Sequence, residues 1–201
     1  MATGIAFKGL VRPVKFIDPD QVEEFIRLVK ESAKAIDAEW ALIGGLAMQW
    51  YGSPRLTGNC DVISSKDLPL ETLENIKKIH SGGTLWKNTN GFELSVHVRN
   101  DEYRALFDGA LKEAVQENGM RVVRPEWLAA MKFACVDERH TLDLHWILRR
   151  ESRGLVDVKR VEQIVYRYLG GLFAKRSFRR TMENVATSLM LERSLDGCEY
   201  P

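Results

Sequence analysis

The residues that are best suited to ligand binding or catalysis lie between positions 41 and 64, a segment with glycine, basic and acidic residues. Gly44 and Gly45 directly follow a short apolar run, where a helix would begin. Glycines let the backbone approach a ligand closely, and the free N–H groups of a helix start bind phosphate oxygens. Asn59 and Asp61 are two residues apart, so in a strand their side chains share one face. The segment therefore predicts a phosphate site next to an oxygen-bearing face suited to a divalent cation.

Simple elements are expected to position these residues. Residues 40–43 form an apolar run typical of a buried strand, and residues 46–51 are the expected short helix after the glycines. Gly52, Ser53 and Pro54 end that helix. Residues 59–63 are the expected second strand. The predicted order is strand, glycine turn, short helix, basic loop and strand.

At these positions the sequence resembles the nucleotidyltransferase-fold superfamily, and within it the AbiEii-like bacterial proteins, which carry a strand–GG/GS–helix–RxTxDhD pattern. The residues that match in order and spacing are Gly44, Gly45, Arg55, Thr57 and Asp61. The resemblance implies transfer of a nucleoside monophosphate from a nucleoside triphosphate to a hydroxyl group. It also implies that the glycine turn holds phosphates, while carboxylates on two strands hold two divalent ions, Mg²⁺ or Mn²⁺.

Two of the three acids that the resemblance implies are replaced in this chain. The first position is Asn59, which offers a carbonyl oxygen but no negative charge. The third aligns best with Ser95, in the strictly alternating run 91–99. Glu93 lies on the same polar face two residues away, as does His97. The metal site is therefore expected either from Asp61, Asn59 and Glu93 or with Asp61 as its one remaining acid.

A second pair of candidate residues lies in the helical part of the chain. Lys132 shares a helical stripe with apolar side chains, and Asp143 does the same in the next helix. A charged side chain that faces a core is costly unless it is paired or bound. The two segments resemble the second conserved region of the same superfamily. This resemblance implies that Lys132 contacts the triphosphate and that Asp143 orients or balances Lys132. The alternative is a structural Lys132–Asp143 ion pair.

The composition gives limits on the partners. The 201 residues are 45% hydrophobic and carry a formal net charge of +1, which argues against a dedicated nucleic-acid coat protein. Basic residues nevertheless concentrate between positions 149 and 180. They predict a basic helical surface that steers RNA, tRNA or a nucleoside triphosphate toward the site, or simply a solvated helix face. These residues are Arg149, Arg150, Arg153, Lys159, Arg160, Arg167, Lys175, Arg176, Arg179 and Arg180.

The predicted fold class is α/β (α+β): a nucleotidyltransferase-fold mixed sheet flanked by helices, with a C-terminal helical bundle. Residues 1–124 are the expected α/β domain, and residues 125–201 the helical domain that contributes Lys132 and Asp143 to the cleft. Other expected elements are helices at 19–37, 69–80 and 101–116, an edge strand at 84–87 and a strand at 120–123. Asp18 and Gln21 are expected to form a capping box. The aromatic residues expected in the helical core are Trp127, Trp146, Tyr166, Tyr168, Phe173 and Phe178.

Three functions from different classes remain open at this point. The first is an active nucleotidyltransferase acting on an RNA, protein or small-molecule hydroxyl. The second is a pseudoenzyme that binds a nucleotide or a partner without turnover. The third is an RNA or protein interaction module of a toxin–antitoxin or phage-defence system. Three cysteines without metal spacing and the lack of a long apolar run predict a cytoplasmic protein that does not enter the membrane.

Overall fold

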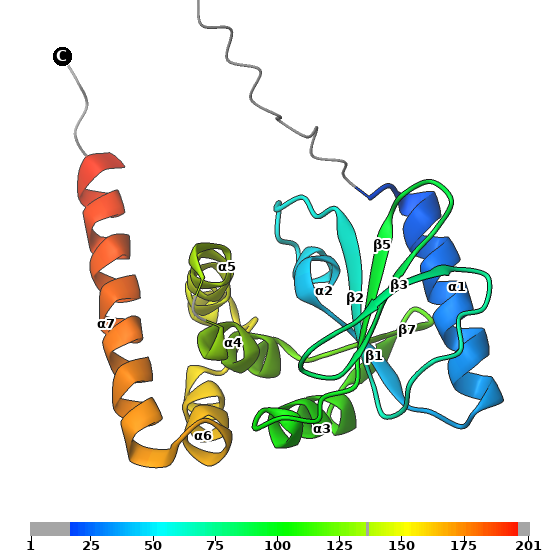
Figure 1. Cartoon of the computed structure of the whole chain (residues 1–201). Coiled ribbons are helices and arrows are strands. Elements are labelled where there is room, and N and C mark those ends of the chain that lie inside the picture. Colours follow the sequence, from blue (N-terminus) through cyan, green and yellow to red (C-terminus); the bar gives the residue numbers. More distant parts are fainter. Residues whose placement is uncertain (1–16, 136, 197–201) are drawn as a thin grey trace, which may run out of the picture.

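A computed structural model describes residues 17–135 and 137–196, with side chains as far as residue 188. Its centre is a mixed seven-stranded sheet with the order β3-β4-β5-β2-β1-β7-β6 (Figure 1). The strands are β1 (Trp40–Ile43), β2 (Asn59–Ser64), β3 (Glu74–Lys78), β4 (Gly83–Lys87), β5 (Glu93–His97), β6 (Val115–Glu117) and β7 (Met120–Val122). The helices are α1 (Pro19–Ala35), α2 (Gly44–Trp50), α3 (Arg104–Lys112), α4 (Pro125–Ala134), α5 (Glu138–Leu148), α6 (Val158–Tyr168) and α7 (Gly171–Asp196). A mixed sheet flanked by helices and followed by a helical bundle is the fold class that the sequence predicts.

The pairing of β2 positions the candidate site. This strand runs antiparallel to β1 and parallel to β5. Asp61 lies opposite Ile43 of β1 and beside Ser95 of β5. Because Gly44 directly follows Ile43, the register places the glycine turn next to Asp61.

Helix α1 covers one side of the sheet, while α2, α3 and the C-terminal helices lie on the other side (Figure 1). The predicted N-cap is present: the backbone N–H of Gln21 donates to Asp18 Oδ1 at 2.9 Å. The expected capping box does not close, however, because the Gln21 side-chain oxygen accepts from Asn88 in the β4–β5 loop instead. That contact ties the start of α1 to the sheet.

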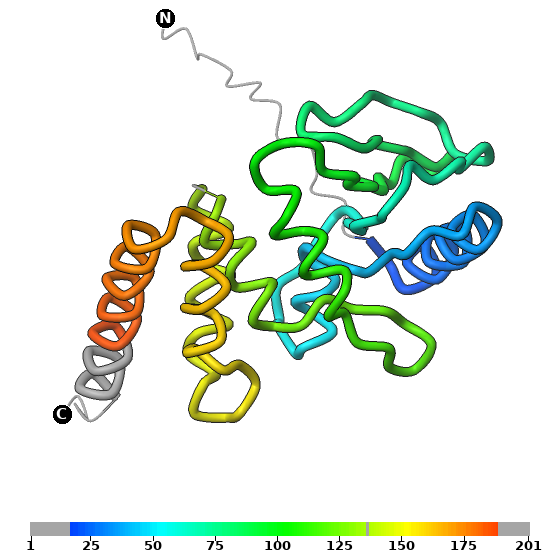
Figure 2. The backbone as a smooth tube through the Cα atoms, turned by 90° about the horizontal axis from the view of Figure 1, so that it is seen from below, coloured from blue at the N-terminus to red at the C-terminus, as the bar shows by residue number. Residues whose placement is uncertain are grey.

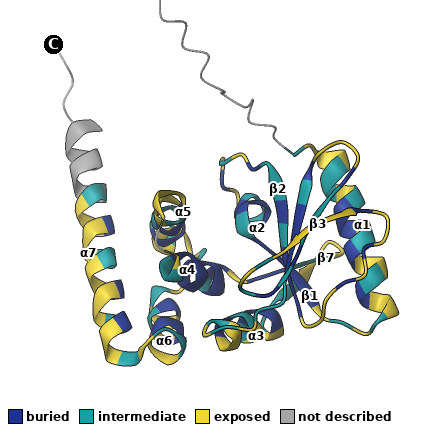
Figure 3. Cartoon of the chain, viewed as in Figure 1, coloured by how far each residue is buried: buried dark blue, intermediate teal, exposed yellow. Residues whose placement is uncertain are grey.

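The prediction of a helix at residues 69–80 is wrong, because residues 74–78 form the edge strand β3. Leu70, Leu73 and Ile76 recur every three residues, which favours a helix on the sequence alone. Pairing with β4 overrides this local preference. Strand β3 is exposed along its whole length (Figure 3), and β4, expected at the edge, lies between β3 and β5.

The helix expected at residues 101–116 is shorter than predicted, since α3 ends at Lys112. The next residues form a hairpin, β6 to β7, that turns at Asn118 and Gly119. Both turn residues have positive φ, 46° and 75°, as a tight two-residue hairpin turn requires. The Asn-Gly pair was the signal in the sequence for this hairpin.

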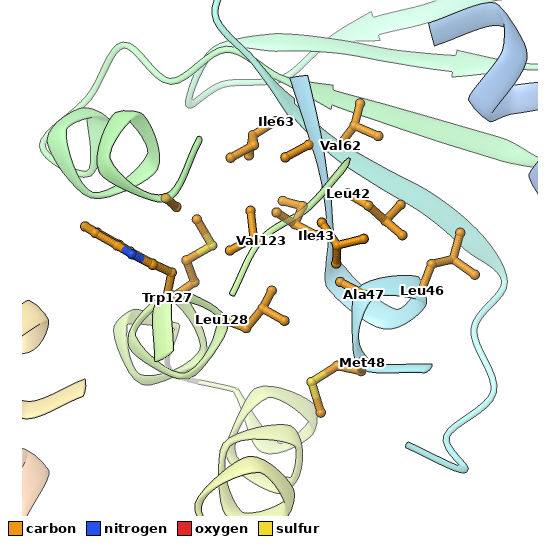
Figure 4. Packing of buried hydrophobic residues seen from close by; sticks show 14 of the residues in the cluster. Leu42, Ile43, Leu46, Ala47, Met48, Val62, Ile63, Val123, Trp127 and Leu128 are labelled. Atoms are coloured by element: carbon orange, nitrogen blue, oxygen red, sulfur yellow. The ribbon is translucent and has the colours of Figure 1, made fainter. Parts of the chain in front are cut away.

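Helix α4 is the link between the sheet and the outer helices. Most of its side chains are buried, which is typical of a helix enclosed on all sides. Trp127 and Leu128 pack in the same core as Ile43 and Val123 (Figure 4). The helices thus share one continuous apolar core with the sheet, while the domain boundary at residue 124 stays a prediction.

The outer layer consists of α6 and α7, which lie side by side in both views (Figures 1 and 2). Among the aromatic residues expected in this core, Trp127 and Phe178 are buried as predicted. The prediction is wrong for Tyr166 and Phe173, which are exposed near the α6–α7 turn. Among the described residues, no helix combines the length and the apolar character that crossing a bilayer requires.

Candidate functional site

A cavity of about 300 Å³ opens where the glycine turn, the polar face of β2 and β5, and helices α3 to α5 meet. The predicted residues that line it are Gly44, Gly45, Arg55, Asn59, Asp61 and Lys132. Thr57, Glu93, Ser95 and Asp143 are not among the lining residues. The sequence therefore indicated much of the cavity wall, although the roles of these residues stay predictions.

The glycine turn brings α2 close to β2. Gly44 has a φ of +67°, and a Cβ on it would lie 2.3 Å from Asp61 Oδ2. A Cβ on Gly45 would lie 2.6 Å from Thr57 Oγ1. Both distances are far below van der Waals contact, so only glycine fits at these two positions. Helix α2 has just seven residues, and phosphate binding by its first N–H groups stays a prediction.

A cationic cluster, formed by Arg55, Lys132 and Arg139, occupies the helical side of the cavity, and Asp143 binds the first two of these residues. Lys132 Nζ lies 2.7 Å and Arg55 Nη1 2.8 Å from Asp143 Oδ2. The side-chain exposures are 4% for Asp143, 7% for Lys132 and 30% for Arg55. Asp143 thus joins α5 to α4 and to the loop before β2. The Lys132–Asp143 contact is the structural ion pair that the sequence analysis gave as an alternative. The sequence did not predict the bond from Arg55 to Asp143.

His140 extends this cluster. Lys132 Nζ and His140 Nδ1 are 3.1 Å apart, and His140 Nε2 lies 3.3 Å from Asp137 Oδ2. Burial and the charge of Lys132 lower the pKa of His140. A neutral imidazole accepts the Lys132 hydrogen at Nδ1 and carries its own proton at Nε2, facing Asp137.

Arg139 precedes His140 in α5 and also lines the cavity. Its side chain makes no ion pair with any residue in the described part of the chain. Its charge acts on the carboxylate of Asp137, and its guanidinium can also meet an anion that enters the cavity.

On the polar face of β2, Asn59 and Asp61 form a hydrogen-bond chain with Thr57, which lies in the loop before the strand. Thr57 Oγ1 donates to Asn59 Oδ1 at 3.1 Å, and Asn59 Nδ2 donates to Asp61 Oδ1 at 2.8 Å. This amide orientation suits the carboxylate, which can only accept. The Asn59 carbonyl is therefore already engaged, and Asp61 receives an N–H group on the side where a second acid is expected.

The oxygen ligands in the cavity do not fit the pair of divalent ions that the sequence resemblance implies. Asp61 is the one carboxylate among the described residues that line the cavity. Glu93 lies beside Asn59 in the sheet register but does not reach the cavity. Within residues 17–135 and 137–196, no group of three His, Cys, Asp or Glu side chains is placed to hold a metal ion. Two divalent ions need more negative charge than one carboxylate supplies.

Three further lining residues come from the β5 segment and from α3. His97 and Arg99 lie on the polar face of the β5 segment, and the alternation of that segment could have indicated both. His97 Nε2 is 3.9 Å from Asp61 Oδ1. Phe107 comes from α3, and nothing in the sequence pattern distinguishes it from a core residue.

The basic helical surface is partly neutralised within the chain. Arg160 pairs with Glu113 at 2.7 Å, and Lys175 and Arg179 both pair with Glu162. Other members remain exposed, notably Arg176 and Arg180.

A mixed sheet with a glycine turn leading to a polar strand defines the architecture of this chain, and several solved structures align with most of the chain at low sequence identity. An antigenic nucleotidyltransferase-like protein from Paracoccidioides brasiliensis is 12% identical with a TM-score of 0.48, over 89% of this chain and 91% of that chain. JHP933 from Helicobacter pylori is 14% identical with a TM-score of 0.48, over 90% and 98%. The antibiotic-resistance factor ANT(2'')-Ia is 14% identical with a TM-score of 0.45, over 90% and 100%. No protein-family model and no curated protein sequence matches the chain.

Proposed function

We propose that the cavity binds the triphosphate of a nucleotide and balances its charge with protein cations rather than with a pair of divalent ions. The observation that carries this proposal is the cationic cluster. Arg55, Lys132 and Arg139 line the cavity, and Asp143, the carboxylate that Arg55 and Lys132 share, is not part of the cavity wall. A bound triphosphate would offset the excess positive charge.

The cluster also has hydrogen-bond donors to spare. An ammonium group has three N–H donors, of which Lys132 uses one for Asp143 and one for His140. Arg55 uses Nη1 for Asp143, although a guanidinium has five donors. The unused donors match the oxygens of a phosphate chain. The glycine turn contributes a backbone that a phosphate can approach closely.

Calorimetric titration with ATP, GTP and inorganic tripolyphosphate tests the proposal directly. We expect each ligand to bind with similar affinity in EDTA and in excess Mg²⁺. Lys132→Met should weaken binding by roughly tenfold or more, as expected for a lost charge-assisted hydrogen bond. Lys159→Met, on the exposed face of α6, is the matched control and should bind like the wild type. Binding that requires Mg²⁺ would overturn the metal-independent mode.

Nucleotidyl transfer is the second candidate function, because Asp61 still lines the cavity beside Gly44. The AbiEii-like resemblance supports an acceptor hydroxyl on RNA, protein or a small molecule. Incubation with α-labelled nucleoside triphosphates, Mn²⁺ or Mg²⁺ and total RNA or protein tests it. No transfer by the wild type, together with transfer by Asn59→Asp, would assign the loss of activity to Asn59.

An RNA or protein interaction module in a toxin–antitoxin or phage-defence system would use the basic helical surface. Arg176 and Arg180 on α7 are the exposed residues that favour it. Reversing the charge of Arg176, Arg179 and Arg180 should then abolish salt-sensitive retention of RNA or tRNA. Retention that stays unchanged would dismiss this role.

A further inference from the structure

The cavity has two ends of different chemistry. One end is the cationic cluster, where Lys132 and Arg55 meet at Asp143. From Asp61 the wall continues to His97, 3.9 Å away, and from there to Phe107, whose ring centroid is 6.4 Å from that of His97. Because His97 pairs with Ile63 in the sheet register, it lies two residues beyond Asp61, or roughly 7 Å along the strands.

The positive charge of Arg99 at this second end is already used. Asp101 accepts from Arg99 Nε at 3.0 Å and from Nη2 at 2.5 Å, and Ser81 Oγ accepts from Nη1 at 2.9 Å. A guanidinium held in this way offers little to a phosphate. Its charge is balanced, so this end is close to neutral while the other end is cationic.

The second end has an aromatic side chain in its wall. Phe107 is half-buried and lines the cavity, although the neighbouring Leu106 and Ala110 of α3 are fully buried. Arg99 fixes its position, with the guanidinium carbon 4.8 Å from the Phe107 ring centroid. Met131 of α4 adds a further apolar side chain to the wall. A flat ring that packs on Phe107 would gain both apolar burial and stacking.

We propose that the nucleobase of the bound nucleotide packs on Phe107, so that Phe107 distinguishes a nucleotide from a bare phosphate chain. This inference rests on the proposed function, since the cationic cluster must hold the triphosphate for the base to reach the neutral end. Stacking accepts every base, so the contact selects for an aromatic ring rather than for one base.

Three ligands of increasing size separate the two ends by calorimetry: inorganic tripolyphosphate, ribose 5-triphosphate and ATP. We expect the wild type to bind ATP roughly tenfold more tightly than ribose 5-triphosphate, as one stacked base provides. In Phe107→Ala and Phe107→Leu this preference should disappear, while the affinity for tripolyphosphate stays that of the wild type. Phe107→Tyr keeps the ring and should keep the preference.

Phe173→Ala is the matched control, because Phe173 is 85% exposed on α7 and remote from the cavity wall. Its ligand preferences should equal those of the wild type. If all three ligands bind the wild type with equal affinity, or if Phe107→Leu weakens tripolyphosphate as much as ATP, the base does not pack on Phe107 and the inference fails alone. If none of the ligands binds the wild type, the proposed function fails with it.

Discussion

The cationic cluster and the polar face of β2 belong to the same cavity but retain different parts of the expected site. In the cluster, Lys132 and Asp143 carry the charges that the resemblance implies, and Arg55 and Arg139 add to them. On the β2 face, Asn59 stands where the resemblance implies the first acid, and its side-chain N–H donates a hydrogen bond to Asp61. The proposed binding of phosphate by the cluster therefore does not depend on the negative charge that two metal ions need.

The largest effect is expected from removing the centre of the cationic cluster. Asp143→Leu leaves Lys132 and Arg55 without their shared carboxylate, so we expect the free energy of unfolding to fall by about 3–5 kcal/mol. Urea unfolding measures it. The double variant Lys132→Met/Asp143→Leu should lose less than the sum of the two single losses, because the buried lysine is no longer unpaired. A loss from Asp143→Leu below about 1 kcal/mol would mean that the cluster is not held by its ion pairs.

The glycine turn joins the two regions and should be the next most sensitive point. Gly44→Ala combines a positive φ with a Cβ only 2.3 Å from Asp61 Oδ2. Gly52 also has a positive φ, but no atom lies within 4 Å of its Cβ position. Gly52→Ala should therefore cost only the backbone strain of about 1–2 kcal/mol, and Gly44→Ala clearly more. Thermal and urea unfolding of both variants give the difference, and equal losses would contradict the close packing of the turn.

The β2 face can be tested by restoring its missing charge. Asn59→Asp replaces the N–H that Asp61 accepts with a second carboxylate, so we expect the metal-free variant to lose about 1 kcal/mol of stability. Mg²⁺ or Mn²⁺ should then raise the unfolding temperature of Asn59→Asp more than that of the wild type. Asn75→Asp on the exposed strand β3 is the control. A wild type stabilised by Mg²⁺ to the same extent would show that Asn59 does not weaken metal binding.

The smallest effect concerns the pH response of the cluster. The pKa of His140 is lowered in the folded protein. As the pH falls, His140 therefore binds a proton near pH 6.5 in the unfolded chain but only at a lower pH in the folded protein. Stability should therefore fall as the pH drops below about 6.5, with a contribution of the same sign from His145, whose pKa burial also lowers. His140→Gln should reduce this slope between pH 7 and 5 in urea unfolding. His80→Gln, at an exposed position, is the control, and an unchanged slope in His140→Gln would exclude His140 as a contributor.

The local elements around the site could be predicted well from the sequence. Strand β1 and the start of β2 lie where the apolar run and the alternation place them, since burial of a short strand between glycine and proline signals leaves few alternatives. The N-cap of α1 is likewise a local hydrogen bond. Residues 69–80 were mispredicted because β3 depends on its pairing with β4, a contact that local spacing does not encode.

The sequence by itself determined the glycine turn, the uncharged amide at Asn59 and the complementary charges of Lys132 and Asp143, because residue type and spacing alone set them. Only the tertiary structure decided that Asp143 also binds Arg55, that Asn59 turns its N–H to Asp61, and that Glu93 stays out of the cavity. Each of these depends on the packing of helices against the sheet and on strand register, which bring together groups far apart in the chain. The place of Phe107 in the cavity wall belongs to the same category.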